Sequence, residues 1–179
     1  MSAGAEPMEN GQSRQTEAAA IGGVLGRVPS GLFIVTWRDA DADRIMLTSW
    51  LMQAGFSPPA ISIAVGRDRQ FLKAAAAPGF QFVVNLLADS QRSLLGRFGK
   101  PTPEGQDPFA GLAISRSPCG AAVLPDTVGW LECASRPPEQ PAAATAAGDH
   151  AIVVSDITVA GNGPADTPLV HLRKSGLHY

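Results

Sequence analysis

Charged residues are scarce in this chain: Asp, Glu, Lys and Arg make up 17% of its 179 residues, against 45% hydrophobic residues. The formal net charge is only −2, and no run of Lys or Arg exceeds two residues. Because nucleic-acid binding relies on clustered positive charge, we expect no nucleic-acid partner. The length and composition instead indicate one globular domain with a sizeable core.

Long apolar runs and cysteines are scarce as well. No apolar stretch approaches the roughly 20 residues of a membrane-spanning helix, so we expect no membrane partner. The first residues lack a basic segment followed by an apolar one, so we expect no secretory signal. The two cysteines, Cys119 and Cys133, match no zinc-binding spacing. We interpret them as small buried hydrophobic residues, with no metal site and a cytoplasmic location.

Hydrophobic periodicity predicts a mainly β chain. We expect residues 1–19 to form a disordered tail and residues 20–179 to form the domain. Runs rich in β-branched and aromatic residues predict strands over residues 32–37, 45–50, 60–65, 80–87, 127–135, 150–160 and 168–174. Short helices are predicted before Pro29, over residues 70–79 and over residues 89–99, and residues 136–148 are predicted to be a flexible loop. This pattern favours a closed or nearly closed β-barrel over a dinucleotide-binding α/β fold.

The stretch RIMLTSWLMQAGFSPPAISIAV, residues 44–65, begins and ends like a strand but is interrupted by polar residues. Gly55 and Pro58-Pro59 predict a crossover at this point, because proline cannot donate into a strand ladder. Backbone groups left unpaired there need other partners, which a planar ligand such as a flavin ring would supply. Alternatively, Thr48 and Ser49 bond locally and Trp50 fills the core.

Six short motifs in one order resemble the flavin reductase-like family, the FMN-binding split barrels. In chain order they are Pro29-Ser30-Gly31, Thr48-Ser49-Trp50 with Pro58-Pro59, the run from Phe82 to Leu87, Gln91 to Leu94, Phe98-Gly99 with Phe109-Ala110-Gly111, and Gly148-Asp149-His150. The resemblance covers residues 21–178. The segment SWLMQAGFSPP and the C-terminal segment LVHLRKSGLHY are most similar to the reductase modules that also occur fused to flavodiiron proteins.

The resemblance implies a mainly β, Greek-key split barrel with a few short helices. It implies an NAD(P)H:flavin oxidoreductase that reduces FMN, or FAD, and passes electrons to a monooxygenase or a flavodiiron partner. It also implies a homodimer. NADH and NADPH are not distinguished as electron donors.

The resemblance also implies a set of site residues. The flavin ring would lie against Thr48, Ser49 and Trp50, with Gln53 as a further candidate. The phosphate would be held by the turn of Gly66, Arg67 and Arg69 and by the step of Phe98, Gly99 and Lys100, which suits the affinity of arginine for phosphate. His150 is the candidate catalytic residue, because an imidazole can relay a proton near neutral pH. Alternatively, the arginines and Lys100 are solvated, and His150 is a structural residue at a strand start.

Two features depart from the family pattern: Ala/Pro-rich sequence precedes Gly148, and the C-terminus lacks an aromatic-rich ending. Two other functions therefore stay open. One is a non-enzymatic FMN-binding electron carrier, and the other is a ligand-binding split barrel without flavin.

Overall fold

The computed structural model describes residues 8–103, 105–136, 146–165 and 167–177. The chain divides into two compact units, Gly31–Leu169 and Met1–Ser30 together with Val170–Tyr179. Among the described residues, no helix has both the length and the apolar character that crossing a membrane requires.

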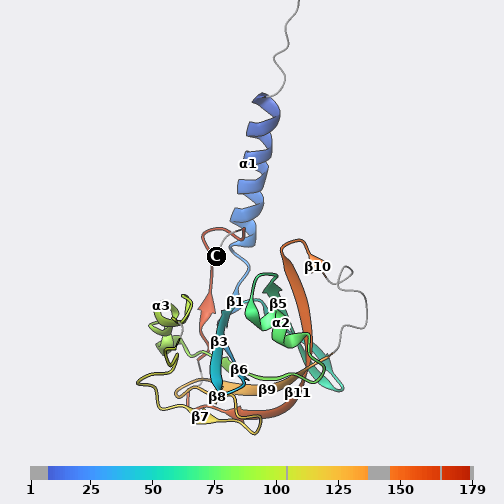
Figure 1. The fold of residues 1–179 in the computed structure, drawn as a ribbon. Helices are drawn as coiled ribbons and strands as arrows, with labels where there is room; N and C mark the ends of the chain where they lie inside the picture. The colour runs from blue at the N-terminus through green and yellow to red at the C-terminus, as the bar shows by residue number, and fades with distance from the viewer. Residues whose placement is uncertain (1–7, 104, 137–145, 166, 178–179) are drawn as a thin grey trace, which may run out of the picture. The chain divides into compact units, whose positions relative to one another are not determined.

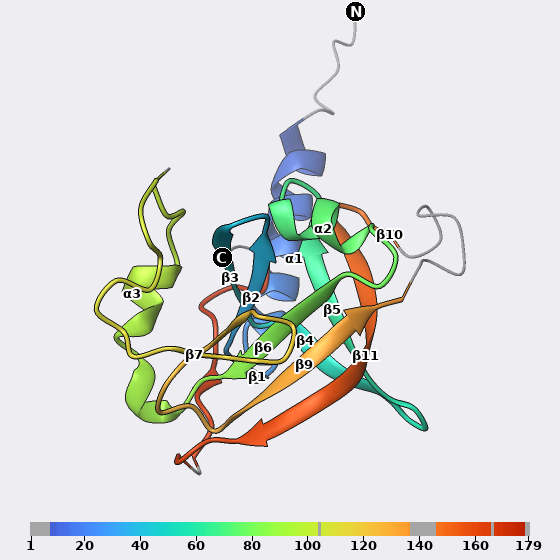
Figure 2. The same ribbon diagram turned by 60° about the horizontal axis from the view of Figure 1, so that its bottom comes forward.

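Seven antiparallel strands of the larger unit form one curved sheet (Figures 1 and 2). They run in the order β3-β2-β6-β9-β11-β5-β4, and the two-residue β10 pairs with β11. Their bounds are β2 (Phe33–Asp39), β3 (Ala42–Thr48), β4 (Leu51–Phe56), β5 (Pro59–Gly66), β6 (Gln81–Leu86), β9 (Gly129–Ser135), β10 (Ala146–Ala147) and β11 (His150–Asn162). β3 and β4 follow one another in the sequence but occupy opposite ends of the strand order, so the barrel is split between them. The prediction of a mainly β split barrel is confirmed.

Alternating residues of the strands fill the inside of the barrel. Val35 and Trp37 of β2 pack with Phe82 and Val84 of β6 in one buried hydrophobic cluster. The helix α2 (Gln70–Ala75) adds Phe71, whose ring meets the rings of Trp37, Phe80 and Phe82 edge-on at 5.0–5.9 Å between centroids. Full burial of a phenylalanine side chain contributes about 2 kcal/mol to the free energy of folding. The helix α2 therefore stabilises the barrel in addition to connecting β5 with β6.

The outer face of β2 and β6 is also covered (Figure 2). The covering segment contains a 3-10 helix (Asp89–Gln91), α3 (Leu94–Phe98) and the small hairpin of β7 (Ser115–Arg116) and β8 (Ala122–Val123). Ile34 of β2 packs there with Phe98 and Phe109. Both faces of β6 are buried, which explains its continuous apolar run.

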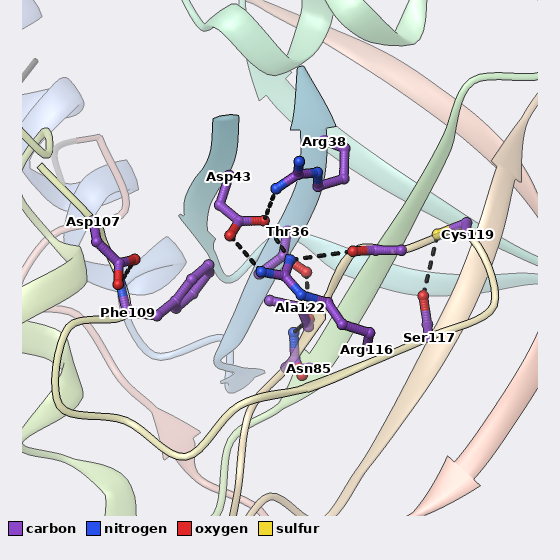
Figure 3. A network of polar contacts seen from close by, with 11 residues as sticks. Thr36, Arg38, Asp43, Asn85, Asp107, Phe109, Arg116, Ser117, Cys119 and Ala122 are labelled. Carbon is purple, nitrogen blue, oxygen red and sulfur yellow. Dashed lines mark hydrogen bonds and ion pairs between the residues drawn. The ribbon is translucent and has the colours of Figure 1, made fainter. Parts of the chain in front are cut away.

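Buried polar bonds fix this cover to the barrel (Figure 3). The amide of Asn85 donates to the carbonyl oxygens of Ile34 and Ala122 and accepts from the N–H of Leu124. The hydroxyl of Thr36 donates to the same Ala122 oxygen at 2.6 Å. Buried polar groups are costly unless they are paired, so these bonds select one position for the β8 strand on the barrel.

An ion pair holds the same hairpin from its other end. The guanidinium of Arg116 grips Asp43 of β3 through two bonds, Nη1–Oδ1 at 2.5 Å and Nη2–Oδ2 at 2.7 Å (Figure 3). Arg38 lies 3.4 Å from the same carboxylate. These bonds, above all that from Arg116, hold the pKa of Asp43 below its usual value although burial opposes the shift.

The two cysteines differ in their surroundings. Cys133 is fully buried in the barrel core, as predicted, and burial raises the pKa of its thiol to about 12. Cys119 is only half-buried and lies at the turn between β7 and β8, where its sulfur is 3.2 Å from the hydroxyl of Ser117. The interpretation as a buried hydrophobic residue is therefore confirmed for Cys133, whereas Cys119 packs against a small hydrophobic cluster but is only partly buried.

The β4–β5 connection differs from the sequence expectation. Residues 51–56, which no periodicity had marked, form β4, and this strand pairs directly with β5 from Leu51↔Ile63 to Phe56↔Pro59. A cis peptide bond joins Ser57 to Pro58 at the turn. The predicted crossover at Gly55 and Pro58-Pro59 is therefore wrong: the prolines close a hairpin, and Pro59 sits at the end of a strand, where no ladder donor is lost.

Other elements follow their predictions more closely. The strands predicted over residues 127–135 and 150–160 are confirmed as β9 and β11. The predicted helix over residues 89–99 is divided into the 3-10 helix and α3. Most of the predicted flexible loop lies outside the described residues.

The smaller unit contains the helix α1 (Met8–Leu25). Residues 8–19, which we expected to be a disordered tail, belong to this helix, and the domain boundary at residue 20 stays a prediction. The end of α1 is fixed by two bonds, from the N–H of Arg173 to Gly26 O and from the N–H of Gly176 to Gly22 O. The flanking strands β1 (Ser30–Gly31) and β12 (Val170–His171) are short, and β12 confirms the centre of the last predicted strand.

Candidate functional site at the split of the barrel

Ser49 and Trp50 form the link between the two edges of the sheet. Thr48, the last residue of β3, still pairs with Phe33 of β2. Ser49 is only 5% exposed, whereas the indole of Trp50 is 37% exposed. The carbonyl oxygen of Trp50 accepts a 2.9 Å bond from the N–H of Ala64 in β5. The expectation that backbone groups are unpaired at this point is therefore wrong for Thr48 and for the carbonyl of Trp50. The alternative that Trp50 fills the core is wrong as well, because its side chain is partly exposed.

His150 lies beside this link. It is the first residue of β11, where it pairs with Gly66 at the end of β5. Its side chain is buried, and its imidazole lies 4.7 Å from the indole of Trp50 between ring centroids, at an interplanar angle of 45°. The fold thus brings together Trp50, Gly66 and His150, three predicted site residues that are up to 100 positions apart in sequence.

The turn before His150 is held by Arg67. Gly148 and Asp149 form the two-residue connection between β10 and β11, because Ala147 pairs with His150. Gly148 has a φ of +58°, a conformation that glycine adopts without strain. The backbone N–H of Arg67 donates to Asp149 O at 3.0 Å, and its Nε–H donates to Gly148 O at 2.9 Å. Arg67 therefore joins the end of β5 to this turn.

Asp149 contacts the imidazole directly. Its Oδ1 lies 2.9 Å from Nδ1 of His150, although the carboxylate itself is 89% exposed. This bond holds the pKa of Asp149 below its usual value. The motif Gly148-Asp149-His150 contains Asp149, but no role was predicted for it; its position between a turn glycine and His150 is the signal in the sequence that points to the site.

The predicted phosphate-binding residues divide into two groups. Arg69 is exposed in the turn after Gly66 and precedes α2, without a side-chain capping bond. At the end of α3, the side chain of Phe98 is buried against Phe109. Only the backbone of Phe98 is therefore left to bind a ligand. Gly99 follows it and lies close to Leu47 of β3, while Lys100 is exposed. The roles of both groups stay predictions.

Two further features, the side chain of Gln53 and a cavity in the outer cover, do not adjoin His150. Gln53 is exposed on β4, next to the irregularity of the β4–β5 pairing. A cavity of about 190 Å³ lies in the outer cover, lined by Ser90, Gln91, Ser93, Leu94, Leu112, Leu124, Pro125 and Asp126. It includes none of the predicted site residues.

Comparison with known proteins identifies the family. The family model described as "Flavin reductase like domain" matches residues 25–176. Diflavin flavoprotein A 1 of Synechocystis sp. is 34% identical over 157 residues, which are 87% of this chain and 26% of that protein. A diflavin flavoprotein of Nostoc sp. is 32% identical over 94% of this chain and 29% of its own length. The chain thus spans between a quarter and a third of these curated relatives.

Solved structures share the fold. The NADH:FAD oxidoreductase of Streptomyces globisporus C-1027 superposes with a TM-score of 0.71 at 25% identity, covering 98% of this chain and 94% of that chain. Component B of the nitrilotriacetate monooxygenase of Mycobacterium thermoresistibile gives 0.72 at 22% identity, covering 93% and 86%. The fold is that of a flavin reductase split barrel. The chain belongs to the flavin reductase-like family.

Proposed function

We propose that this protein is an NAD(P)H-dependent flavin reductase that reduces FMN or FAD. Family membership supports the class of activity. The observation that carries the proposal is the contact of Trp50 with His150 at the split of the barrel. A partly exposed tryptophan contacts a buried imidazole there, next to Thr48 and Ser49 in the chain, which suits a planar ring with several hydrogen-bonding atoms.

The residues at the split fit a flavin. When bound, the flavin accepts hydride from the nicotinamide and supplies the redox chemistry. Thr48 and Ser49 orient the ring, and the indole of Trp50 forms an apolar wall beside it. His150 holds a proton that can move to or from the ring system. Arg69 and Lys100, both exposed cations, attract the phosphate.

We also propose a homodimer through the β4–β5 hairpin. β4 is an edge strand, and its side chains from Met52 onward are exposed on both faces. Met52 is 72% exposed and Phe56 is 89% exposed. Exposed apolar residues along an edge strand are typical of an interaction surface, and the hairpin starts next to Trp50.

We infer that the electron acceptor is a flavodiiron protein or a monooxygenase. The curated relatives are diflavin flavoproteins, and a structural neighbour is described as the flavin reductase component of a two-component tryptophan halogenase. Both support delivery of reduced flavin, or its electrons, to a diiron protein or an oxygenase. We place the protein in the cytoplasm, where NADH and NADPH are available.

An absorbance spectrum tests this function. The purified protein is mixed with FMN or FAD and titrated anaerobically with NADH and, separately, with NADPH. We expect bleaching of the flavin bands at a rate that depends on the protein and that falls in His150→Gln. Bound flavin that neither nucleotide bleaches would instead favour an electron carrier, and the absence of flavin binding would favour a barrel for another ligand.

A further inference from the structure

We propose that Asp149 and Arg67 are positioning residues that fix which nitrogen of His150 carries the proton. The carboxylate of Asp149 contacts the imidazole directly, and Arg67 acts through its bonds to the Gly148–Asp149 turn. The inference rests on the proposed function only for its catalytic consequence, because the proton's place on the ring is a property of the chain alone.

The proton assignment follows from the acceptor chemistry of Asp149. An ionised carboxylate accepts hydrogen bonds and donates none. Asp149 is exposed, and its pKa lies below the usual value, so it is ionised at neutral pH. Across the 2.9 Å contact, Nδ1 of His150 must therefore be the donor. In the neutral imidazole, the lone pair then resides on Nε2.

Arg67 fixes where the carboxylate stands. Its backbone N–H and its Nε–H bond to the carbonyl oxygens of Asp149 and Gly148, so both residues of the turn are tied to the end of β5. β5 and β11 are paired along seven residue pairs, from His150↔Gly66 to Asp156↔Ala60, which makes this support rigid. Trp50 covers the imidazole at 4.7 Å. The ring is thereby held between an indole and a turn that has little freedom to move.

This arrangement gives Arg67 a role other than phosphate binding. Nε is committed to Gly148, and the same bond directs the guanidinium toward the β10–β11 turn. A lysine at position 67 would keep the charge. A guanidinium can bond to the turn through Nε–H and still offer N–H donors on its other side, whereas the single ammonium group of lysine has no such arrangement. Arg67→Lys therefore separates the two roles: it keeps the positive charge and the backbone N–H bond to Asp149 O, but it removes the Nε–H bond to Gly148 O.

Nitrogen-15 NMR of the imidazole tests the inference without flavin. The chain has three histidines, so His171→Gln and His150→Gln assign the signals. At a pH about two units above the ordinary imidazole pKa of roughly 6.5, we expect His150 to show a protonated Nδ1 and an unprotonated Nε2. Asp149→Ala should shift this tautomer ratio about threefold to tenfold toward a protonated Nε2, the range of one hydrogen bond exposed to water.

Two further variants sharpen the result. Asp149→Asn keeps an oxygen acceptor and should retain most of the tautomer preference. Asp41→Ala, which removes an exposed carboxylate from the β2–β3 turn, should leave it unchanged. If Asp149→Ala shows the same nitrogen spectrum as the unaltered chain, the inference is wrong, whether or not the protein reduces flavin.

Steady-state kinetics measure the catalytic consequence. We expect Asp149→Ala and Arg67→Lys to lower kcat about tenfold with little change in the KM for flavin, because proton relay depends on ring orientation. An unchanged kcat in Arg67→Lys would overturn the positioning role of Arg67. Absence of any reductase activity would refute the proposed function, whereas the nitrogen spectra would still decide the inference.

Discussion

The indole ring of Trp50 lies against the imidazole ring of His150, with ring centroids 4.7 Å apart and the planes at 45°. Trp50 comes from the link between β3 and β4, whereas His150 is the first residue of β11, and both lie at the end of β5. Four predictions follow from the arrangement around this contact and from the surfaces that support it.

The first prediction concerns the wall that Trp50 forms. Trp50→Ala should weaken FMN binding by about 1 kcal/mol, because an aromatic contact contributes roughly 0.5–1.5 kcal/mol beyond its buried area. Trp50→Phe should retain most of the affinity. Quenching of FMN fluorescence on titration with protein measures both. Trp130→Phe, on β9, is the control, and equal affinity of Trp50→Ala and the unaltered chain would refute the placement of the ring.

The second prediction concerns the hydroxyls at the end of β3. Thr48→Val combined with Ser49→Ala should weaken FMN binding by about 1–3 kcal/mol, because donors to a desolvated ligand are removed. Isothermal titration calorimetry gives the dissociation constant. Since Ser49 is buried, the thermal midpoint of the flavin-free variant has to be measured as well. An unchanged dissociation constant in a folded variant would exclude these residues from the flavin site.

The third prediction concerns the ion pair of Asp43 with Arg116. Asp43→Asn should lower the free energy of unfolding at pH 7 by about 1 kcal/mol, a value limited by the exposure of Arg116. Arg116, as hydrogen-bond partner and as charge, holds the pKa of Asp43 below its usual 3.8. The stabilisation is therefore fully present above pH 3.8 and is lost as the pH falls through the lower pKa of the folded state.

Urea unfolding at pH 7 and in acid measures the effect of Asp43→Asn. Below the folded pKa of Asp43, the variant and the unaltered chain should converge. Asp39→Asn is the matched control, because its pair with Arg44 lies on the same hairpin but both side chains are well exposed, at 61% and 42%. A loss of stability at pH 7 that persists unchanged in acid would show that the charge pair is not its cause.

The fourth prediction concerns the proposed dimer. Phe56→Ser should weaken self-association by about 2 kcal/mol, the scale of an aromatic residue at the centre of an interface. Sedimentation velocity over a range of protein concentrations measures the change. Leu172→Ser removes a 61% exposed leucine outside the hairpin and should have no effect. A chain that sediments as a monomer before any substitution would refute the dimer.

The sequence predicted the elements whose pattern reflects burial. β6 carries apolar residues on both faces because the barrel core and the outer cover both bury it, and β9 and β11 likewise have strong strand patterns. In contrast, β4 escaped prediction because its side chains from Met52 to Phe56 are exposed on both faces, so no alternation marks it as a strand. Without β4, the prolines at positions 58 and 59 could only be taken as a crossover.

The sequence by itself thus determined the fold class, the family and the residue types available for the site, because these depend on local pattern and on motifs in order. Only the tertiary structure decided which of those residues meet. The pairing of β5 with β11 places Gly66 beside His150 and turns Arg67 toward Gly148 and Asp149. The hydrophobic pattern of a strand determines which of its faces is buried. It does not specify which strand becomes its neighbour when the two are as far apart in the sequence as β5 and β11.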